Sequence, residues 1–221
     1  MKILSAISGL LFPRKCHFCR KLLSKNETDL CHDCRCDAPE FIRAKRTFPL
    51  IAQWTAVWYY KDKVRSSILR FKFGNARGYA DFYGRALAMK LEDMPAVKAC
   101  DYITWVPVSP LRRFFRGYDQ AELLAVALGK ELGLPPVKAL KKVRHNRPQS
   151  NIHNAASRRA NVMNAYWPEN RDLFAGKQVL LVDDVLTTGA TAAECAKMLR
   201  FGGAREIYFA AVAAASHDKN K

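Results

Sequence analysis

QVLLVDDVLTTGAT, residues 178–191, is the stretch of sequence that decides the fold. Its four apolar residues at 179–182 are rich in branched side chains and uninterrupted by polar ones, which is typical of a central parallel strand buried on both faces. Two carboxylates, Asp183 and Asp184, follow where such strands bind ligands. The sequence therefore predicts that at least one of them reaches the hydroxyls of a sugar diol or a bound Mg²⁺.

A phosphate-binding loop is predicted directly after the two acids. The apolar spacing of residues 192–199 is that of a helix, so the loop before it lies at a helix N-terminus, where backbone N–H groups have no intrahelical partner. Small side chains let an anion approach these groups, and hydroxyls add donors. A capped helix without a ligand would use similar residue types. The predicted phosphate-binding residues are Thr187, Thr188, Gly189, Ala190 and Thr191.

Charge and size restrict the class of protein. The chain has 221 residues, 49% of them hydrophobic, which is enough for one large domain with a small appendage. Its net charge of +17 exceeds what solubility requires. A polyanionic partner is therefore expected, although a basic surface without a specific partner is the alternative.

The N-terminus combines one lysine with apolar residues, as a signal peptide does. No small-residue cleavage site follows, and residues 3, 4, 7, 10 and 11 fall on one helical face, so a short amphipathic helix is predicted. No stretch reaches the roughly 20 apolar residues of a membrane span. We therefore expect a cytoplasmic protein.

Two C-x-x-C pairs predict a structural Zn²⁺ site with four thiolate ligands. Two disulfides are disfavoured because they need an oxidising compartment, and a redox C-x-x-C would not need a duplicate. The predicted ligands are Cys16, Cys19, Cys31 and Cys34. Neighbours that could replace one thiolate are His17, His32 and Cys36.

The order of elements favours two domains. Residues 1–46 would hold the N-terminal helix and the zinc module, and residues 47–221 the larger domain, since residues 38–49 have the composition of a linker. In the larger domain the patterns predict three further segments of strand and two of helix. The predicted strands are 54–60, 101–108 and 206–215, and the helical patterns lie at 64–71 and 119–128.

Basic residues gather in two segments. Residues 135–168 contain no acid, and within them 146–154 has the composition of a mobile loop. Basic and aromatic residues alternate through 70–83, which suits base stacking by Phe71 or Tyr79, although such aromatics more often belong to a core. The predicted nucleic-acid-binding residues are Arg70, Lys72, Lys141, Lys142, Arg144, Arg147, Arg158 and Arg159.

VLLVDDVLTTGAT resembles the phosphoribosyl pyrophosphate (PRPP) motif of type I phosphoribosyltransferases. The whole order of segments is similar to the ComF family of bacterial competence proteins and the related GntX-type proteins. The segments that carry the likeness are the four-cysteine module, ILRFKFG (68–74), WVPV (105–108), FRGYDQAELLA (115–125), an Arg-Pro-Gln stretch before SRRANV (157–162), and VLLVDDVLTTGAT (179–191). Two departures from the family pattern are Ser109, where a second proline is frequent, and Asp119, where asparagine is common.

The resemblance implies an α/β fold, a type I phosphoribosyltransferase-like parallel sheet flanked by helices and preceded by a small zinc ribbon. It also implies PRPP with Mg²⁺ as ligand, Asp183 and Asp184 as catalytic acids, and a loop over the active site at the predicted mobile segment. Forked hydrogen bonds from arginines near a strand end would suit pyrophosphate. The pyrophosphate loop would comprise Pro107, Val108, Ser109, Arg112, Arg113 and Arg116.

The function expected from these features is that of a PRPP-binding protein in DNA uptake, which binds single-stranded DNA and has partners in the uptake machinery. The alternative is an active phosphoribosyltransferase of nucleotide or base salvage with no DNA role. A zinc-ribbon adaptor alone would leave the phosphate loop unexplained.

Overall fold

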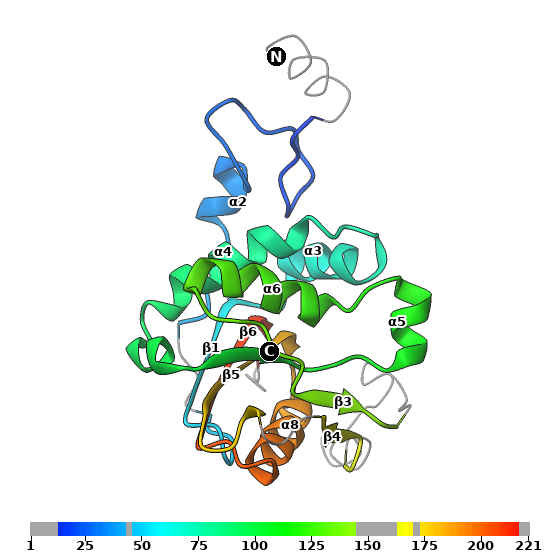
Figure 1. Ribbon diagram of the computed structural model, residues 1–221. Coiled ribbons are helices and arrows are strands. Elements are labelled where there is room, and N and C mark those ends of the chain that lie inside the picture. The colour runs from blue at the N-terminus through cyan, green and yellow to red at the C-terminus, as the bar shows by residue number, and fades with distance from the viewer. Residues whose placement is uncertain (1–12, 43–45, 145–162, 170–172, 217–221) are drawn as a thin grey trace, which may run out of the picture.

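The computed structural model describes residues 13–42, 46–144, 163–169 and 173–216. These residues form a parallel sheet covered by helices on both faces, and the segment with the four cysteines lies beyond the helices of one face (Figure 1). The predicted helix at residues 1–12 lies outside the described residues. Within the part of the chain that is described, no helix is long and apolar enough to cross a membrane.

The main sheet has four parallel strands in the order β1-β6-β5-β2. These are β1 (Gln53–Tyr59), β2 (Tyr102–Trp105), β5 (Gln178–Leu186) and β6 (Glu206–Ala214). The central strands β5 and β6 are buried along most of their length because helices cover both faces. The predicted central strand is confirmed, with residues 179–182 fully buried.

Helices on the two faces enclose separate apolar clusters (Figure 1). One face carries α3 (Asp62–Phe73), α4 (Tyr79–Leu91) and α6 (Gln120–Leu132), and the other carries α8 (Ala190–Phe201). The shorter described helices are α2 (His32–Cys36), the 3-10 helix η1 (Pro95–Ala99) and α5 (Pro110–Arg116).

A small antiparallel hairpin packs against α8. Its strands are β3 (Leu140–Lys142) and β4 (Tyr166–Pro168), and Lys141 pairs with Trp167. The segment 146–154, predicted as a mobile loop, falls between these strands and outside the described residues.

Most predicted elements form, with boundaries that follow the local pairing. β5 extends past the acids to Leu186 because its last residues still pair with β6. β2 ends at Trp105, before the two prolines of Pro107–Pro110, whose missing N–H groups cannot continue a ladder. The helix α5 was not predicted, although Ser109 as N-cap and Pro110 at the first helical position are start signals.

Gly84 lets α4 approach α6 closely. A Cβ at Gly84 would lie 2.9 Å from Ala127 Cβ and 3.0 Å from the Ala127 carbonyl carbon. Gly84→Ala should therefore lower the free energy of unfolding by about 1–3 kcal/mol, as overpacking does, despite the better helix propensity of alanine. Gly78→Ala is the matched control, because a Cβ there meets nothing within 4 Å, and it should be neutral. Urea denaturation measures both; equal effects would contradict the close packing.

Candidate functional site

The two acids lie where β2 leaves the side of β5. The last pair between these strands is Trp105 with Val182, and the Val106 N–H donates to the Val182 carbonyl at 3.0 Å. Beyond this point β5 continues beside β6 alone, with Asp183 aligned with Ala211. The carboxyl end of a parallel strand, next to a neighbour that has turned away, is where such sheets bind ligands.

Asp184 forms an ion pair with Lys72 in the last turn of α3. Lys72 Nζ lies 2.8 Å from Asp184 Oδ1, with 20% and 11% of the two side chains exposed. Burial lowers the pKa of Lys72, but the charge of Asp184, its hydrogen bond to Lys72 and the charge of Asp183 together outweigh burial, so that the pKa lies above its ordinary value. A fixed cation therefore stands beside the acids. The sequence analysis predicted Lys72 as a nucleic-acid-binding residue and not as part of this site.

Asp183 lies on the other side of the strand, toward α8 and the hairpin. Burial raises the pKa of its carboxyl well above the ordinary value, and the neighbouring charge of Asp184 raises it further. Its Oδ1 accepts the Asp184 N–H at 2.8 Å. Of the hairpin, Lys142 is the nearest cation: its Nζ donates to the Tyr166 hydroxyl at 3.2 Å, and burial lowers its pKa. The charge of Asp183 thus has no ion pair of its own among the contacts described and is available to a cation or to hydroxyl donors.

The loop after β5 leads directly into the N-terminus of α8. Gly189 is the N-cap of α8 in the left-handed region at φ 78°, which a side chain would strain. A Cβ there would also lie 2.0 Å from Cε1 of Phe48. The Ala190 N–H donates to Thr188 Oγ1 at 3.4 Å, and α8 shows no other side-chain cap. The predicted loop residues 187–191 are thereby brought together over the first turn of α8.

Two residues at this loop were missed by the sequence analysis. Arg46 donates from Nη1 to the Thr187 carbonyl at 3.1 Å, and its guanidinium lies 4.6 Å from the ring centre of Phe48. Phe48 packs where a side chain at Gly189 would stand. No sequence signal marks them, because they sit in the segment predicted as a linker and reach the loop only through the tertiary fold.

The predicted pyrophosphate segment surrounds the N-termini of α5 and α6. Ser109 caps α5 by accepting the Arg112 N–H. Asp119 caps α6 by accepting the Ala121 and Glu122 N–H groups, and its Oδ2 also accepts the Val108 N–H at 2.9 Å. Ser109 and Asp119, the two departures from the family pattern, therefore both have hydrogen-bond partners close by in the chain. A carboxylate at position 119 can accept on two oxygens, where asparagine has one.

The arginines of α5 divide between two directions. Arg116 is half-buried, donates from Nη1 to Gln120 Oε1 at 2.7 Å and places its guanidinium 4.7 Å from the ring centre of Phe73. Burial lowers the pKa of Arg116, and the negative charge of Asp184 partly opposes that decrease. The guanidinium of Arg116 therefore lies within electrostatic reach of the acids. Arg113 is more exposed and pairs with Glu122 at 3.1 Å.

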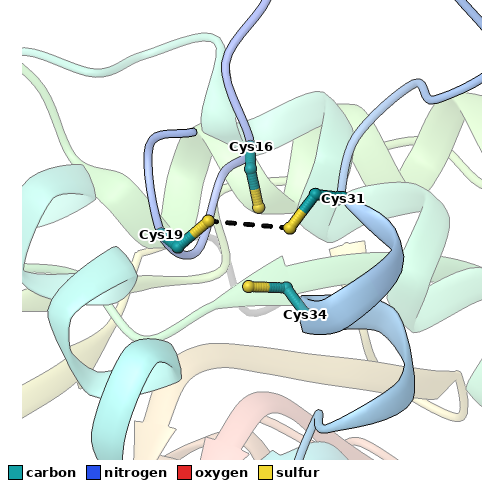
Figure 2. A group of neighbouring side chains, drawn as sticks. All are labelled: Cys16, Cys19, Cys31 and Cys34. Carbon is teal, nitrogen blue, oxygen red and sulfur yellow. Dashed lines mark hydrogen bonds between the residues drawn. The ribbon is translucent and has the colours of Figure 1, made fainter. Parts of the chain in front are cut away.

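The four cysteines meet in one cluster, with all four Sγ atoms within 4.8 Å of one another (Figure 2). Tetrahedral Zn²⁺ with Zn–S bonds of about 2.3 Å would hold sulfurs about 3.8 Å apart. The Sγ atoms of Cys19 and Cys31, at 3.6 Å, are already near that separation and are joined by a hydrogen bond, not by a disulfide. Burial raises the pKa of Cys16, but backbone N–H groups of Cys19, Cys31 and Phe18 outweigh burial and bring it to about 7. Burial raises the pKa of Cys34, so the positive charge of a bound metal ion would be needed to keep that thiol ionised. The four sulfurs lie close enough together to hold such an ion.

The neighbours that might have replaced a thiolate stand apart from this cluster. His17 Nδ1 contacts the Asp29 carbonyl at 2.9 Å, and the ring stacks on Phe82 at 4.6 Å. His32 and Cys36 are exposed and lie beside each other, 3.8 Å from Nε2 to Sγ. The group of four therefore consists of cysteines alone.

The segment 13–37, which we call the four-cysteine module, is docked on α3 and α4 (Figure 1). Arg70 donates from Nη2 to the carbonyls of His17 (2.8 Å) and Phe18 (2.6 Å). Arg85 holds both carboxylate oxygens of Asp29 at 2.8 and 2.9 Å. The boundary between a domain of residues 1–46 and one of residues 47–221 remains a prediction.

The described members of the predicted nucleic-acid-binding set have different surroundings, and their role in nucleic-acid binding stays a prediction. Arg70 donates to the carbonyls of His17 and Phe18, and Lys72 forms an ion pair with Asp184, so both are engaged within the protein. Stacking on Phe71 or Tyr79 is wrong, because both rings are buried, with 0% and 6% exposed. Lys141 and Arg144 are exposed, whereas Lys142 is half-buried. The predicted residues Arg147, Arg158 and Arg159 lie outside the described residues.

Comparisons with known proteins place the sequence near phosphoribosyltransferase and competence proteins. The family "Phosphoribosyl transferase domain" matches residues 119–221. Competence protein F of Haemophilus influenzae is 34% identical over 156 residues, which cover 68% of each chain. DNA utilization protein YhgH of Salmonella typhimurium is 34% identical over 108 residues, 48% of this chain and less than half (46%) of that protein. Among solved structures, the allosteric regulatory enzyme of purine biosynthesis is 24% identical with a TM-score of 0.43, over 62% of this chain and 26% of that one.

The fold is thus of the type I phosphoribosyltransferase class, a parallel sheet flanked by helices, with a four-cysteine cluster near the N-terminus. Within that class, the chain belongs to the competence protein F, or ComF, family.

Proposed function

We propose that this protein binds PRPP with Mg²⁺ at the carboxyl end of β5 and acts in DNA uptake, where it handles single-stranded DNA. The observation that supports it most directly is the junction of β5 and α8. Two acids, one without an ion pair of its own and one held by Lys72, stand directly before the N-terminus of α8, which begins with the small residues Gly189 and Ala190.

Each part of PRPP has a group of suitable chemistry in this arrangement. Asp183 and Asp184 would hold the ribose hydroxyls, and the loop of residues 187–191 the 5-phosphate. The segment 107–109 with Arg112, Arg113 and Arg116 would hold pyrophosphate. Mg²⁺ would neutralise pyrophosphate oxygens. Departure of pyrophosphate leaves positive charge at the anomeric carbon, which the two carboxylates would stabilise.

The proposed role in DNA uptake is supported by the sequence similarity to two named relatives. One relative is named a competence protein and another a DNA utilization protein. The net charge of +17 fits a polyanionic partner better than a small phosphorylated substrate alone. We therefore favour a protein that binds single-stranded DNA and components of an uptake machinery over an enzyme of base salvage with no DNA role. We propose a cytoplasmic location for it.

The four-cysteine cluster is proposed to hold one Zn²⁺ with a structural role. A module of this size buries little apolar surface by itself, and its four Sγ atoms gather within 4.8 Å of one another.

Calorimetric titration with PRPP and MgCl₂ tests the proposal. Wild-type protein should release or absorb heat with PRPP only when Mg²⁺ is present and should unfold at a higher temperature in the presence of both. If neither signal occurs at millimolar PRPP, the proposed site does not bind this ligand.

DNA binding is expected to depend steeply on salt. If about five cations meet phosphates of single-stranded DNA, the slope of log affinity against log salt should be near −3.5, since each contact contributes roughly −0.7. Neutralising Arg144, Arg147, Arg158 and Arg159 together should flatten the slope, by roughly 0.7 for each of them that meets a phosphate. Fluorescence anisotropy across a salt series measures it.

A matched control neutralises the same number of exposed cations elsewhere, and it should leave the slope nearly unchanged. Suitable residues are Lys61, Arg65, Lys98 and Lys197. Equal losses in the two variants would mean that net charge, and not the acid-free segment, is responsible for binding.

A further inference from the structure

The short helix α5 presents an apolar face that nothing in the described chain covers. Leu111, Phe114 and Phe115 are spaced three and four residues apart, so they share one face, and they are 48%, 81% and 77% exposed. The two phenylalanine rings meet edge to face at 5.8 Å. None of the residues of α5 is buried, so these side chains do not serve the core.

The helix that carries this face lies near the acids at the end of β5, with its opposite side toward them. Arg116, on the opposite side of α5, lies within electrostatic reach of Asp184. Its guanidinium stacks on Phe73, a third exposed phenylalanine (68%) that follows Lys72 in α3. The apolar face and the proposed PRPP site are therefore two sides of the same helix.

The surroundings of this face are cationic. Four arginines lie next to it in the sequence or in space. One of them, Arg113, forms an ion pair with Glu122 at 3.1 Å. These arginines are Arg77, Arg112, Arg113 and Arg116. A partner that fits needs negative charge at short intervals together with flat apolar groups.

We propose that Phe114 and Phe115 of α5 form a stacking platform for the unpaired bases of single-stranded nucleic acid, whose phosphates run past Arg77 and Arg113, the exposed members of this group of arginines. Base–aromatic stacking with a cationic groove is the usual means of binding single strands without sequence preference. A duplex fits less well because its base faces are covered by their neighbours. The inference rests on the DNA role proposed above and assigns its base contacts to residues other than Phe71 and Tyr79.

A second copy of this chain is a less suitable occupant. A symmetric contact through α5 would bring the same patch of each copy together, and hence its arginines against their counterparts. Such like-charge contacts are unfavourable unless an anion separates them.

The test compares two probes of equal length and phosphate charge, an oligothymidylate and an oligomer of abasic sites. Wild-type protein should bind the oligothymidylate more tightly than the abasic oligomer. Phe114→Ala and Phe115→Ala should each reduce affinity for oligothymidylate by about 5-fold to 150-fold, the range for one stacked base, and leave affinity for the abasic oligomer unchanged. The salt slope should stay the same because no phosphate contact is removed.

Phe201→Ala is the matched control, because this ring is also exposed (55%) but lies at the far end of α8 from the phosphate loop. It should change neither affinity. Thermal unfolding should be the same for all variants, since the substituted rings are outside the core.

Three outcomes would overturn the proposal. Wild-type protein could bind both probes equally, or the α5 variants could lose affinity for both probes alike. The variants could also convert a dimer into monomers in sedimentation velocity without any change in oligothymidylate binding, which would make the face a contact between copies. Failure of wild type to bind either oligomer would refute the DNA role as well, whereas loss of base discrimination alone refutes only the platform.

Discussion

Asp183→Asn should abolish measurable Mg²⁺-PRPP binding and at the same time raise the thermal stability of the unliganded protein. Burial and the charge of Asp184 raise the pKa of the Asp183 carboxyl, so its ionised form is held in the folded protein at a cost in stability. Asparagine removes that charge. Loss of a charged group that a ligand needs typically weakens binding by about 2–5 kcal/mol.

The pH dependence has a definite sign. A carboxyl whose folded-state pKa lies above its unfolded value favours the folded state at low pH and loses that contribution as pH rises through the folded-state pKa. The stability advantage of Asp183→Asn over wild type should therefore grow with rising pH in the range above the ordinary pKa of aspartate. Mg²⁺-PRPP affinity of the wild type should rise over the same range, because binding requires the ionised carboxylate.

Asp184→Asn should have the opposite effect on stability. It leaves the largely buried ammonium of Lys72 without its partner at 2.8 Å, and removal of one member of a buried pair costs up to about 3–5 kcal/mol. The double variant Asp184→Asn with Lys72→Met should recover part of that loss. Both variants should still fail to bind Mg²⁺-PRPP.

Thermal unfolding and calorimetry of these variants, with Asp81→Asn as an exposed control on α4, measure the two effects. The adjacent carboxylates should shift the melting temperature in opposite directions. Shifts of the same sign in both single variants would refute the electrostatic description of the site.

Removal of Zn²⁺ should unfold the four-cysteine module. Structural Zn²⁺ sites contribute on the order of 10–16 kcal/mol of apparent binding free energy, far more than this module's few buried residues supply. Elemental analysis should give one zinc per chain for wild type and none for Cys16→Ser or Cys34→Ser. The melting temperature should fall in these variants and in the presence of a strong chelator.

Cys36→Ser is the matched control, because Cys36 is exposed and outside the cluster. It should retain both metal and stability. A metal-free protein with a Cys16–Cys19 disulfide, identified by mass spectrometry after purification without reductant, would disprove the zinc site.

Unfolding of the four-cysteine module should also weaken ligand binding at Asp183 and Asp184. Arg70 donates to the carbonyls of His17 and Phe18, between the first two cysteines. Lys72, two residues further along α3, forms the ion pair with Asp184. Chelation should therefore weaken Mg²⁺-PRPP binding. Arg70→Met should keep zinc and yet weaken the same binding, which separates the role of α3 from that of the metal.

Local sequence was sufficient for the features that depend on neighbours along the chain. The run of residues 179–182, the acids after it and the Thr-Gly loop predicted a central strand, a ligand edge and a helix N-terminus, because strand burial and helix caps are set by residues within a few positions. The paired C-x-x-C spacing likewise predicted the four-cysteine cluster, since each pair makes its own knuckle.

Only the tertiary structure decided which side chains surround these features. Lys72 and Arg70 carry the same charge as the other cations of their segment, and only the packing of α3 between module and sheet gives one to Asp184 and the other to the cysteine knuckle. Phe71 is buried and Phe73, two residues later, is exposed, because the C-terminal turn of α3 leaves the core there. Arg46 and Phe48 reach a loop some 140 positions away, as the 141-residue separation of the Arg46–Thr187 contact shows. Pairing between distant segments is set by how whole faces pack, which no local pattern encodes.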